Sequence, residues 1–176
     1  MMISRLFAIF APSPAHVAMM INSMSALASA ATILFLFWSI THLARRSYHK
    51  SEEELTLPQI TAIMGAGLVG SIAYTFTDTF WFSAVEGEVY ALSSMFTALV
   101  FWAILKWENV ADEPHANRWL ILIAYLTGLA IGVHLLNLLI IPPIVLIYYF
   151  RKYSVTKWGV VKALLVSAAI LVAAMF

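Results

Sequence analysis

Long apolar runs separated by short charged segments constrain this chain more than any other feature of its sequence. A helix needs about 20 predominantly apolar residues to cross a bilayer, with a range of roughly 17–25. Runs of that kind occupy residues 15–44, 58–76 and 84–107, and another extends over residues 158–176. The remaining run, residues 119–150, is longer than a single span requires.

The composition indicates that lipid is the solvent around these runs. Hydrophobic residues make up 62% of the 176 residues and charged residues only 11%, with a mean hydropathy of +0.89. Soluble domains are nearer half apolar and a quarter charged, and a core of this size cannot bury the excess. We therefore predict an all-α, polytopic transmembrane helical bundle whose first partner is the lipid bilayer. The formal charge of +1 gives no reason to expect nucleic acid as a partner.

The distribution of Lys and Arg predicts how the longest run crosses the membrane. Cytoplasmic loops carry the basic excess, and nine of the ten basic residues fall inside if residues 119–150 cross twice, with Arg5 the exception. We therefore predict a helical hairpin that turns near residues 134–137, for about six membrane segments in all. Arms of about 15 residues would be roughly 22 Å long, so the turn should lie below the outer surface. Pro142 and Pro143 should kink or shorten the returning arm.

Three carboxylates, Asp78, Glu86 and Glu88, fall on the predicted outer side. Glu88 lies within the run 84–107, and ionisable residues inside a span are rare and usually face a cavity, which favours a functional role. Glu86 is either functional or the partner of Ser83 in a capping box at a helix start. Asp78 is most simply a loop residue at the membrane surface.

Aromatic and polar side chains accompany these acids. Trp81 is most simply part of an interfacial aromatic belt, although a sugar could stack on its face. Tyr90 lies one helical turn from Glu86, so the two could share a face. His134 and Asn137 could hydrogen-bond between helices, for about 0.6–2 kcal/mol, or contribute to a functional site in which His134 donates to a phosphate.

The remaining patterns predict ordinary structure. The pairs Gly128–Gly132 and Ala66–Gly70 indicate close contacts between helices. The acids of the two inner loops, including Glu108 and Asp112, are expected in solvated linkers. The five histidines have no zinc-binding spacing, so no metal site is predicted, and the absence of cysteine excludes disulfides and thiolate chemistry.

Acids, aromatic rings and an imidazole at one membrane face are compatible with more than one function. Carboxylates can act as general bases, and an imidazole or arginine can bind a phosphate, which would suit a lipid-phosphate sugar. The same groups would suit a proton- or ion-coupled transporter subunit. A non-catalytic scaffold whose acids only cap helices is the third possibility.

Three segments carry a resemblance to a known family: residues 22–46 (NSMSALASAATILFLFWSITHLARR), 78–91 (DTFWFSAVEGEVYA) and 128–143 (GLAIGVHLLNLLIIPP). They resemble bacterial multi-pass membrane proteins, formerly of unknown function, that are related to the eukaryotic protein O-mannosyltransferases of the GT-C superfamily. The resemblance covers essentially the whole chain, and the string FWFSAVEGEVYA within it is specific.

The resemblance implies an enzyme that passes a sugar from a polyprenyl-phosphate donor to a Ser or Thr of a protein acceptor. It implies a location in the bacterial inner membrane with the site facing the periplasm, and leaves open whether a divalent metal takes part. It also implies that residues 1–11 form an outer interfacial helix, which would explain the outward position of Arg5. His134, with Asn137 and Arg5, would contact the donor phosphate, while Glu86 and Glu88 would line the acceptor or sugar site.

One departure from the family pattern affects the expected activity. GT-C enzymes keep their catalytic acid in the first outer loop, upstream of the helix that carries Arg5. This sequence begins at Met1, which is too late for it to contain that motif. The last run also reaches Phe176 without a flanking charge. We therefore expect a fragment that is inactive alone.

Overall fold

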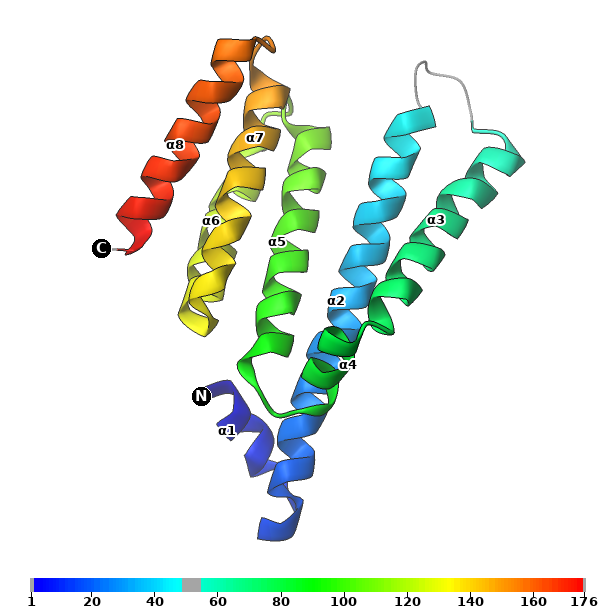
Figure 1. The fold of residues 1–176 in the computed structure, drawn as a ribbon, viewed down its shortest axis with the longest axis vertical. Coiled ribbons are helices and arrows are strands. Elements are labelled where there is room, and N and C mark those ends of the chain that lie inside the picture. The colour runs from blue at the N-terminus through cyan, green and yellow to red at the C-terminus, as the bar shows by residue number, and fades with distance from the viewer. Residues whose placement is uncertain (1, 49–54, 176) are drawn as a thin grey trace. The chain divides into compact units, whose positions relative to one another are not determined.

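A computed structural model of the chain describes residues 2–48 and 55–175, and within these residues it is entirely helical. The predicted all-α class is therefore confirmed for the described part. In chain order the elements are α1 (Met2–Ile9), η1 (Pro14–His16), α2 (Val17–Tyr48), α3 (Leu57–Thr75), α4 (Asp78–Val85), α5 (Val89–Val110), α6 (Asn117–Val133), η2 (Leu135–Ile140), α7 (Ile141–Lys152) and α8 (Lys157–Met175) (Figure 1). The two η elements are 3-10 helices.

Five helical segments among the described residues are long and apolar enough to cross a membrane. They are Pro14–Tyr48, Leu57–Thr75, Val89–Val110, Leu135–Lys152 and Lys157–Met175. The shorter apolar helix Asn117–Val133 brings the total to the six segments that the sequence predicts. The chain is thus an integral, multi-pass membrane protein.

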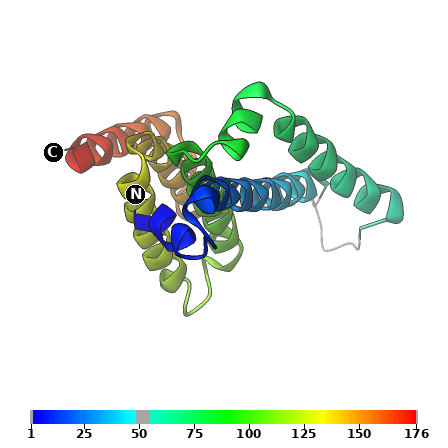
Figure 2. The ribbon, with the colours of Figure 1, turned by 90° about the horizontal axis from the view of Figure 1, so that it is seen from below.

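The helices form two compact units, Met1–Met95 and Phe96–Phe176, with the boundary inside α5. In the first unit α1, α3 and α4 pack on α2 (Figure 2). A Cβ added to Gly67 would lie 2.5 Å from Thr41 Cγ2, and one added to Gly70 would lie 2.7 Å from Ile40 Cδ1. The glycines therefore let α3 approach α2 closely, as predicted for Gly70.

The second unit contains the predicted hairpin. At the end of α7, Arg151 Nε donates a hydrogen bond to the Glu108 carbonyl at 3.0 Å, and Lys152 Nζ donates to the Ala111 carbonyl at 2.6 Å. Because Glu108 and Ala111 end α5 and precede α6, the chain must run out along α6 and return along η2 and α7. The helical hairpin inferred from the basic residues is therefore present, and its double crossing of the membrane stays a prediction.

The arms of the hairpin are longer than predicted. Pro142 and Pro143 lie in the first turn of α7, where a missing N–H costs no hydrogen bond, and the α-helical part of the returning arm begins there, after the 3-10 helix η2. With η2 as a 3-10 helix, residues 135–152 extend about 30 Å, and α6 extends about 26 Å. Both arms are therefore longer than the roughly 22 Å expected from the sequence, and the depth of the turn at His134 in the membrane stays a prediction.

Two further predictions for this unit are wrong. Glu108 is not in a solvated linker, because α5 continues to Val110 and leaves this residue only 9% exposed. The Gly128–Gly132 pair makes no close contact with another helix within the described residues, since no atom other than those of its chain neighbours and its own helix backbone lies within 4 Å of a Cβ added at either position. The buried residues of α6 are instead Ile123, Thr127 and Ala130, while both glycines are exposed.

Candidate functional site

Glu86, Gly87 and Glu88 form a tight turn between α4 and α5, which we call the acid turn. The Glu88 N–H donates a hydrogen bond to the Glu86 carbonyl at 2.9 Å, the i to i+2 pattern of a γ-turn. Gly87 does not adopt a positive φ, so this is the common inverse form. The turn leaves both glutamate side chains exposed.

The acid turn corrects three predictions from the sequence. Glu88 does not lie inside the span, because α5 begins only at Val89. The capping box does not form, since Ser83 Oγ donates to the Thr79 carbonyl at 2.8 Å and Glu86 follows the end of α4 with an extended backbone. Tyr90 therefore does not share a helix with Glu86. The Ser83–Glu86 spacing predicts the start of a helix, whereas in the structure helix α4 ends at Val85.

Contact with α2 holds the acid turn in place. A Cβ added to Gly87 would lie 2.6 Å from Ile21 Cγ2 and 3.1 Å from Asn22 Oδ1. Glycine is needed here for space rather than for backbone conformation, because any side chain would push the turn away from α2. The two carboxylates thus flank a backbone segment that rests directly on a long helix.

Helix α4 was not predicted, and it changes the setting of Asp78. Thr77 precedes the helix with an extended backbone, and Asp78 is its first residue. A threonine followed by an acid in the first turn is a recognisable helix start, because the acid favours the positive end of the helix dipole. Asp78 is exposed and is not part of an unstructured loop.

The aromatic residues of α4 divide between packing and exposure. Phe80 is 5% exposed, and its ring centroid lies 4.7 Å from that of Tyr74. Trp81 is 51% exposed and stacks on Phe76 with ring centroids 6.1 Å apart. An exposed indole in this position fits both an interfacial belt and a sugar platform, so the choice between those roles stays a prediction.

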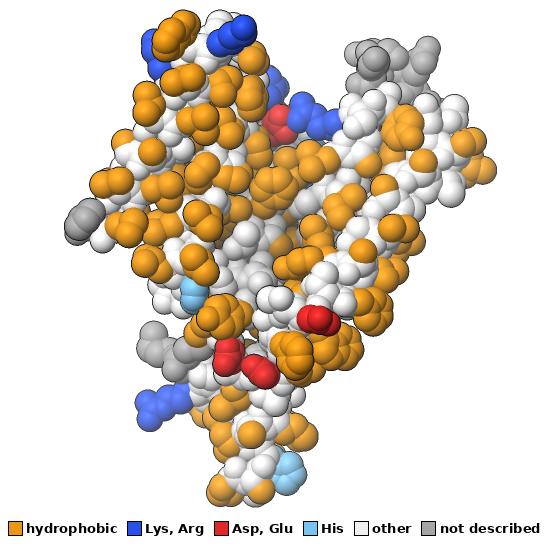
Figure 3. All heavy atoms as spheres, viewed as in Figure 1, with side chains coloured by type: hydrophobic (Ala, Val, Ile, Leu, Met, Phe, Trp, Pro, Cys, Tyr) orange, Lys and Arg blue, Asp and Glu red, His pale blue; other side chains and the backbone are white. Residues whose placement is uncertain are grey.

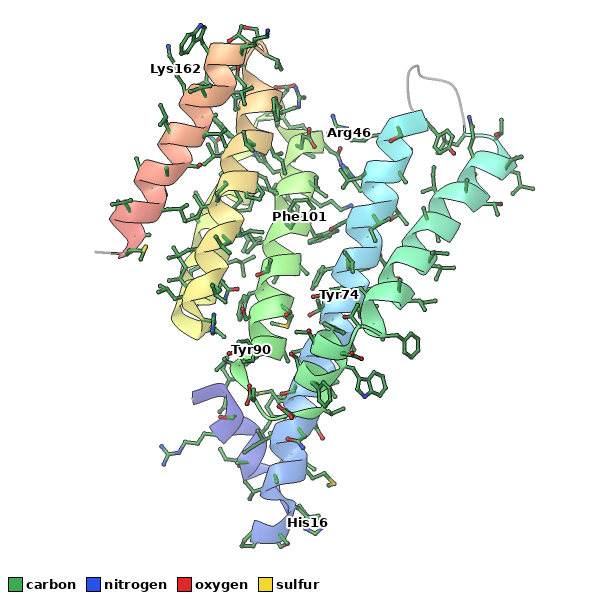
Figure 4. The ribbon with its side chains drawn as sticks, in the orientation of Figure 1. His16, Arg46, Tyr74, Tyr90, Phe101 and Lys162 are labelled. Atoms are coloured by element: carbon green, nitrogen blue, oxygen red, sulfur yellow. The ribbon has the colours of Figure 1, made fainter. Side chains whose placement is uncertain are left out.

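Figure 3 shows acidic side chains among hydrophobic ones around this part of the chain. Figure 4 shows Tyr90 at the start of α5, directly after the acid turn, and its side chain is 47% exposed. Arg5 is exposed on α1, which packs against α2. The first unit therefore contains six of the eight residues proposed from the sequence: Arg5, Asp78, Trp81, Glu86, Glu88 and Tyr90.

His134 lies at the turn of the hairpin and joins two helices. Its N–H donates to the Ala130 carbonyl at 3.0 Å, which completes the end of α6. Its Nδ1 accepts a hydrogen bond from the Leu136 N–H at 3.1 Å, which caps η2. With Nδ1 acting as an acceptor, the proton of the neutral ring is on Nε2. The cap therefore fixes both the ring orientation and the identity of the donor nitrogen.

Asn137 is buried, with 2% exposure, and hydrogen-bonds between helices. Its Nδ2 donates to the Ala130 carbonyl at 2.5 Å, and its Oδ1 accepts from Thr97 Oγ1 at 2.9 Å. The side chain thus ties η2 to both α6 and α5. Of the two roles considered from the sequence, the contacts support hydrogen bonding between helices, and a phosphate contact from Asn137 stays a prediction.

Asp112 was expected in a solvated linker, but it belongs to an ion-pair cluster. Its carboxylate pairs with Arg151 and accepts a hydrogen bond from Lys152 at 3.0 Å. The hydrogen bonds from Lys152 and Arg151 hold the pKa of Asp112 below its ordinary value of 3.8. The cluster ties the segment before α6 to the end of α7, so its role in this unit is structural.

Each of the two units offers its own set of functional groups. The first unit presents two exposed carboxylates on a turn supported by α2, close in sequence to an exposed indole and an exposed phenol. The second presents an imidazole whose donor nitrogen is fixed by its cap. The assembly of both groups into one pocket stays a prediction.

Residues 1–157 match the family described as Protein O-mannosyl-transferase TMEM260 N-terminal domain. The match includes all eight residues proposed from the sequence and ends as α8 begins. No curated protein and no solved structure matches the chain.

Proposed function

Because this chain belongs to the Protein O-mannosyl-transferase TMEM260 N-terminal domain family, we propose that it binds both substrates of a sugar transfer within the membrane. The donor is a sugar linked to a polyprenyl phosphate, and the acceptor is a Ser or Thr hydroxyl of a protein. The acceptor oxygen attacks the anomeric carbon, the bond from that carbon to the phosphate oxygen breaks, and polyprenyl phosphate leaves.

The acid turn is the observation that carries this proposal. Glu86 and Glu88 are exposed, lie on either side of one glycine, and rest on α2 through that glycine. Carboxylates held in this way can hydrogen-bond sugar hydroxyls and accept the proton of the acceptor hydroxyl. We assign both to the acceptor or sugar site, with Asp78, Trp81 and Tyr90 as further substrate contacts.

His134 is assigned to the phosphate of the donor. The cap that uses Nδ1 as an acceptor leaves Nε2 as the donor nitrogen, and a phosphate oxygen accepts such a hydrogen bond. Arg5 is a second candidate, since it is exposed on α1 and carries a permanent charge. Asn137 would support the site by holding η2 against its neighbours.

We further propose that the site faces the non-cytoplasmic side of the membrane. The second unit contains six basic residues, and each lies in the half of its helix that is away from the His134 end of the hairpin: Lys106, Arg118, Arg151, Lys152, Lys157 and Lys162. Cytoplasmic segments carry such an excess of basic residues. His134, at the other end of the hairpin, would then be on the opposite side.

A transfer assay on the complete protein, reconstituted in liposomes, tests the assignment. Glu88→Gln and His134→Ala should each lower kcat/KM for sugar transfer by about tenfold or more, equivalent to roughly 1.4 kcal/mol. Glu113→Gln is the matched control, because it removes an exposed carboxylate from the connection between α5 and α6. Normal turnover in both test variants would remove these residues from the site and leave the scaffold interpretation.

A further inference from the structure

A groove between α7 and α8 lies in the second unit and does not include His134 among its lining residues. It has a volume of about 390 Å³, within the roughly 300–1,000 Å³ that is usual for ligand pockets. Three tyrosines, Tyr148, Tyr149 and Tyr153, line it from the end of α7, with Lys162 and Val166 on α8. This is the end of α7 away from η2 and His134.

The tyrosine wall of the groove is held in place by identifiable contacts. Tyr148 stacks on Trp107 with ring centroids 5.2 Å apart, and Tyr149 stacks on Tyr153 at 5.9 Å. The Tyr149 hydroxyl donates to the Ser154 carbonyl at 3.0 Å and so joins the wall to the α7–α8 connection.

Gly159 lets this wall meet α8. A Cβ added to Gly159 would overlap the Tyr149 hydroxyl, so the glycine admits the tyrosine against the start of the helix. The groove is therefore formed by fixed rings against a helix that offers no side chain at the point of contact.

Lys162 supplies the charge of the groove. It lies five residues after the start of α8, about 7.5 Å along the helix, and its side chain is exposed (Figure 4). It makes no hydrogen bond or ion pair within the described residues, whereas Arg151 and Lys152 are paired with Asp112. A lysine at this depth can extend along apolar surface and keep its ammonium at the level of the lipid headgroups.

We propose that this groove binds one anionic phospholipid from the surrounding bilayer. One acyl chain would lie against the tyrosine rings and Val166, and the headgroup phosphate would pair with the Lys162 ammonium. Charge complementarity selects this occupant. Among the described residues that line the groove there is one cation and no carboxylate, so an anionic headgroup gains an ion pair that a zwitterionic lipid gains only in part.

The proposal is tested by native mass spectrometry of the complete protein taken from vesicles with equal amounts of phosphatidylglycerol and phosphatidylcholine. The first bound lipid should favour phosphatidylglycerol roughly fivefold, the factor that corresponds to about 1 kcal/mol per lysine near an anionic surface. Lys162→Gln should bring the ratio close to one, Lys162→Arg should keep it, and Val166→Phe should reduce binding of both lipids by filling the groove.

Lys157→Gln is the matched control, since it removes the same charge from α8 at a position outside the groove. An equal loss in Lys157→Gln and Lys162→Gln would overturn the proposal in favour of diffuse attraction to the membrane surface. Equal binding of the two lipids by the unmodified protein would also overturn the proposal. So would the absence of any retained lipid, because another protein segment would then cover the groove. Displacement by equimolar polyprenyl phosphate would reassign the groove to the carrier.

Discussion

Replacing Asn137 by Ala should destabilise the hairpin by removing two hydrogen bonds from a buried position. The lost bonds run from Asn137 Nδ2 to the Ala130 carbonyl and from Thr97 Oγ1 to Asn137 Oδ1. Side-chain hydrogen bonds between membrane helices contribute about 0.6 kcal/mol on average and up to about 1.7 kcal/mol. Two such bonds at a side chain with 2% exposure predict a loss of about 1–3 kcal/mol in the free energy of unfolding.

A double-mutant cycle separates the Thr97 bond from the general effect of truncating Asn137. Thr97→Val keeps the shape of the side chain and removes its hydroxyl, so the coupling with Asn137→Ala should be about 0.6–1.7 kcal/mol. The free energies are measured by reversible unfolding of the complete protein in mixed detergent micelles. Thr61→Val is the control, because within the part of the chain that the structure describes the Thr61 hydroxyl bonds to the Leu57 carbonyl of its own helix and to no other helix. Additive effects would refute the bridge between η2 and α5.

Two further predictions use the same unfolding measurement. Gly87→Ala should destabilise the protein by about 1–3 kcal/mol, because the added Cβ meets α2. Gly128→Ala should instead stabilise it by roughly 0.5–1 kcal/mol, because this helical position is open. Equal effects of the two substitutions would contradict the close approach of the acid turn to α2. The lowered pKa of Asp112 means that its contribution to stability is fully present above pH 3.8 and is lost as the pH falls through the lower pKa of the folded state. Asp112→Asn should therefore lack this part of the acid-induced loss, and identical acid-unfolding curves for the two proteins would exclude a role for its pairs with Arg151 and Lys152.

The features predicted correctly from the sequence are those set by large free energies. Lipid-facing helices must satisfy their own backbone groups, so the lengths of apolar runs predict how many segments cross the membrane. Charged side chains are costly to translocate, so the basic residues around residues 151–162 predict that the preceding run returns to the same side. The contacts of Arg151 and Lys152 with the end of α5 agree with that prediction.

The features that were missed depend on contacts between residues far apart in the chain. Ser83 and Glu86 have the spacing of a helix start, yet the turn at Gly87 rests on Ile21 and the helix ends there instead. The position of Asn137 depends partly on Thr97, forty residues earlier. A short helix such as α4 also gives little periodic signal, and only the Thr77–Asp78 pair marked its start.

The most direct test of the proposed non-cytoplasmic site is to measure on which side of the membrane each segment lies. The sequence contains no cysteine, so single cysteines can be introduced at the exposed positions Glu86, Leu136 and Glu113 with any others in the complete protein removed. A membrane-impermeant maleimide applied to intact cells should label Glu86→Cys and Leu136→Cys, and should label Glu113→Cys only after permeabilisation. Labelling of positions 86 and 136 from opposite sides, or of positions 113 and 136 from the same side, would contradict a single non-cytoplasmic site.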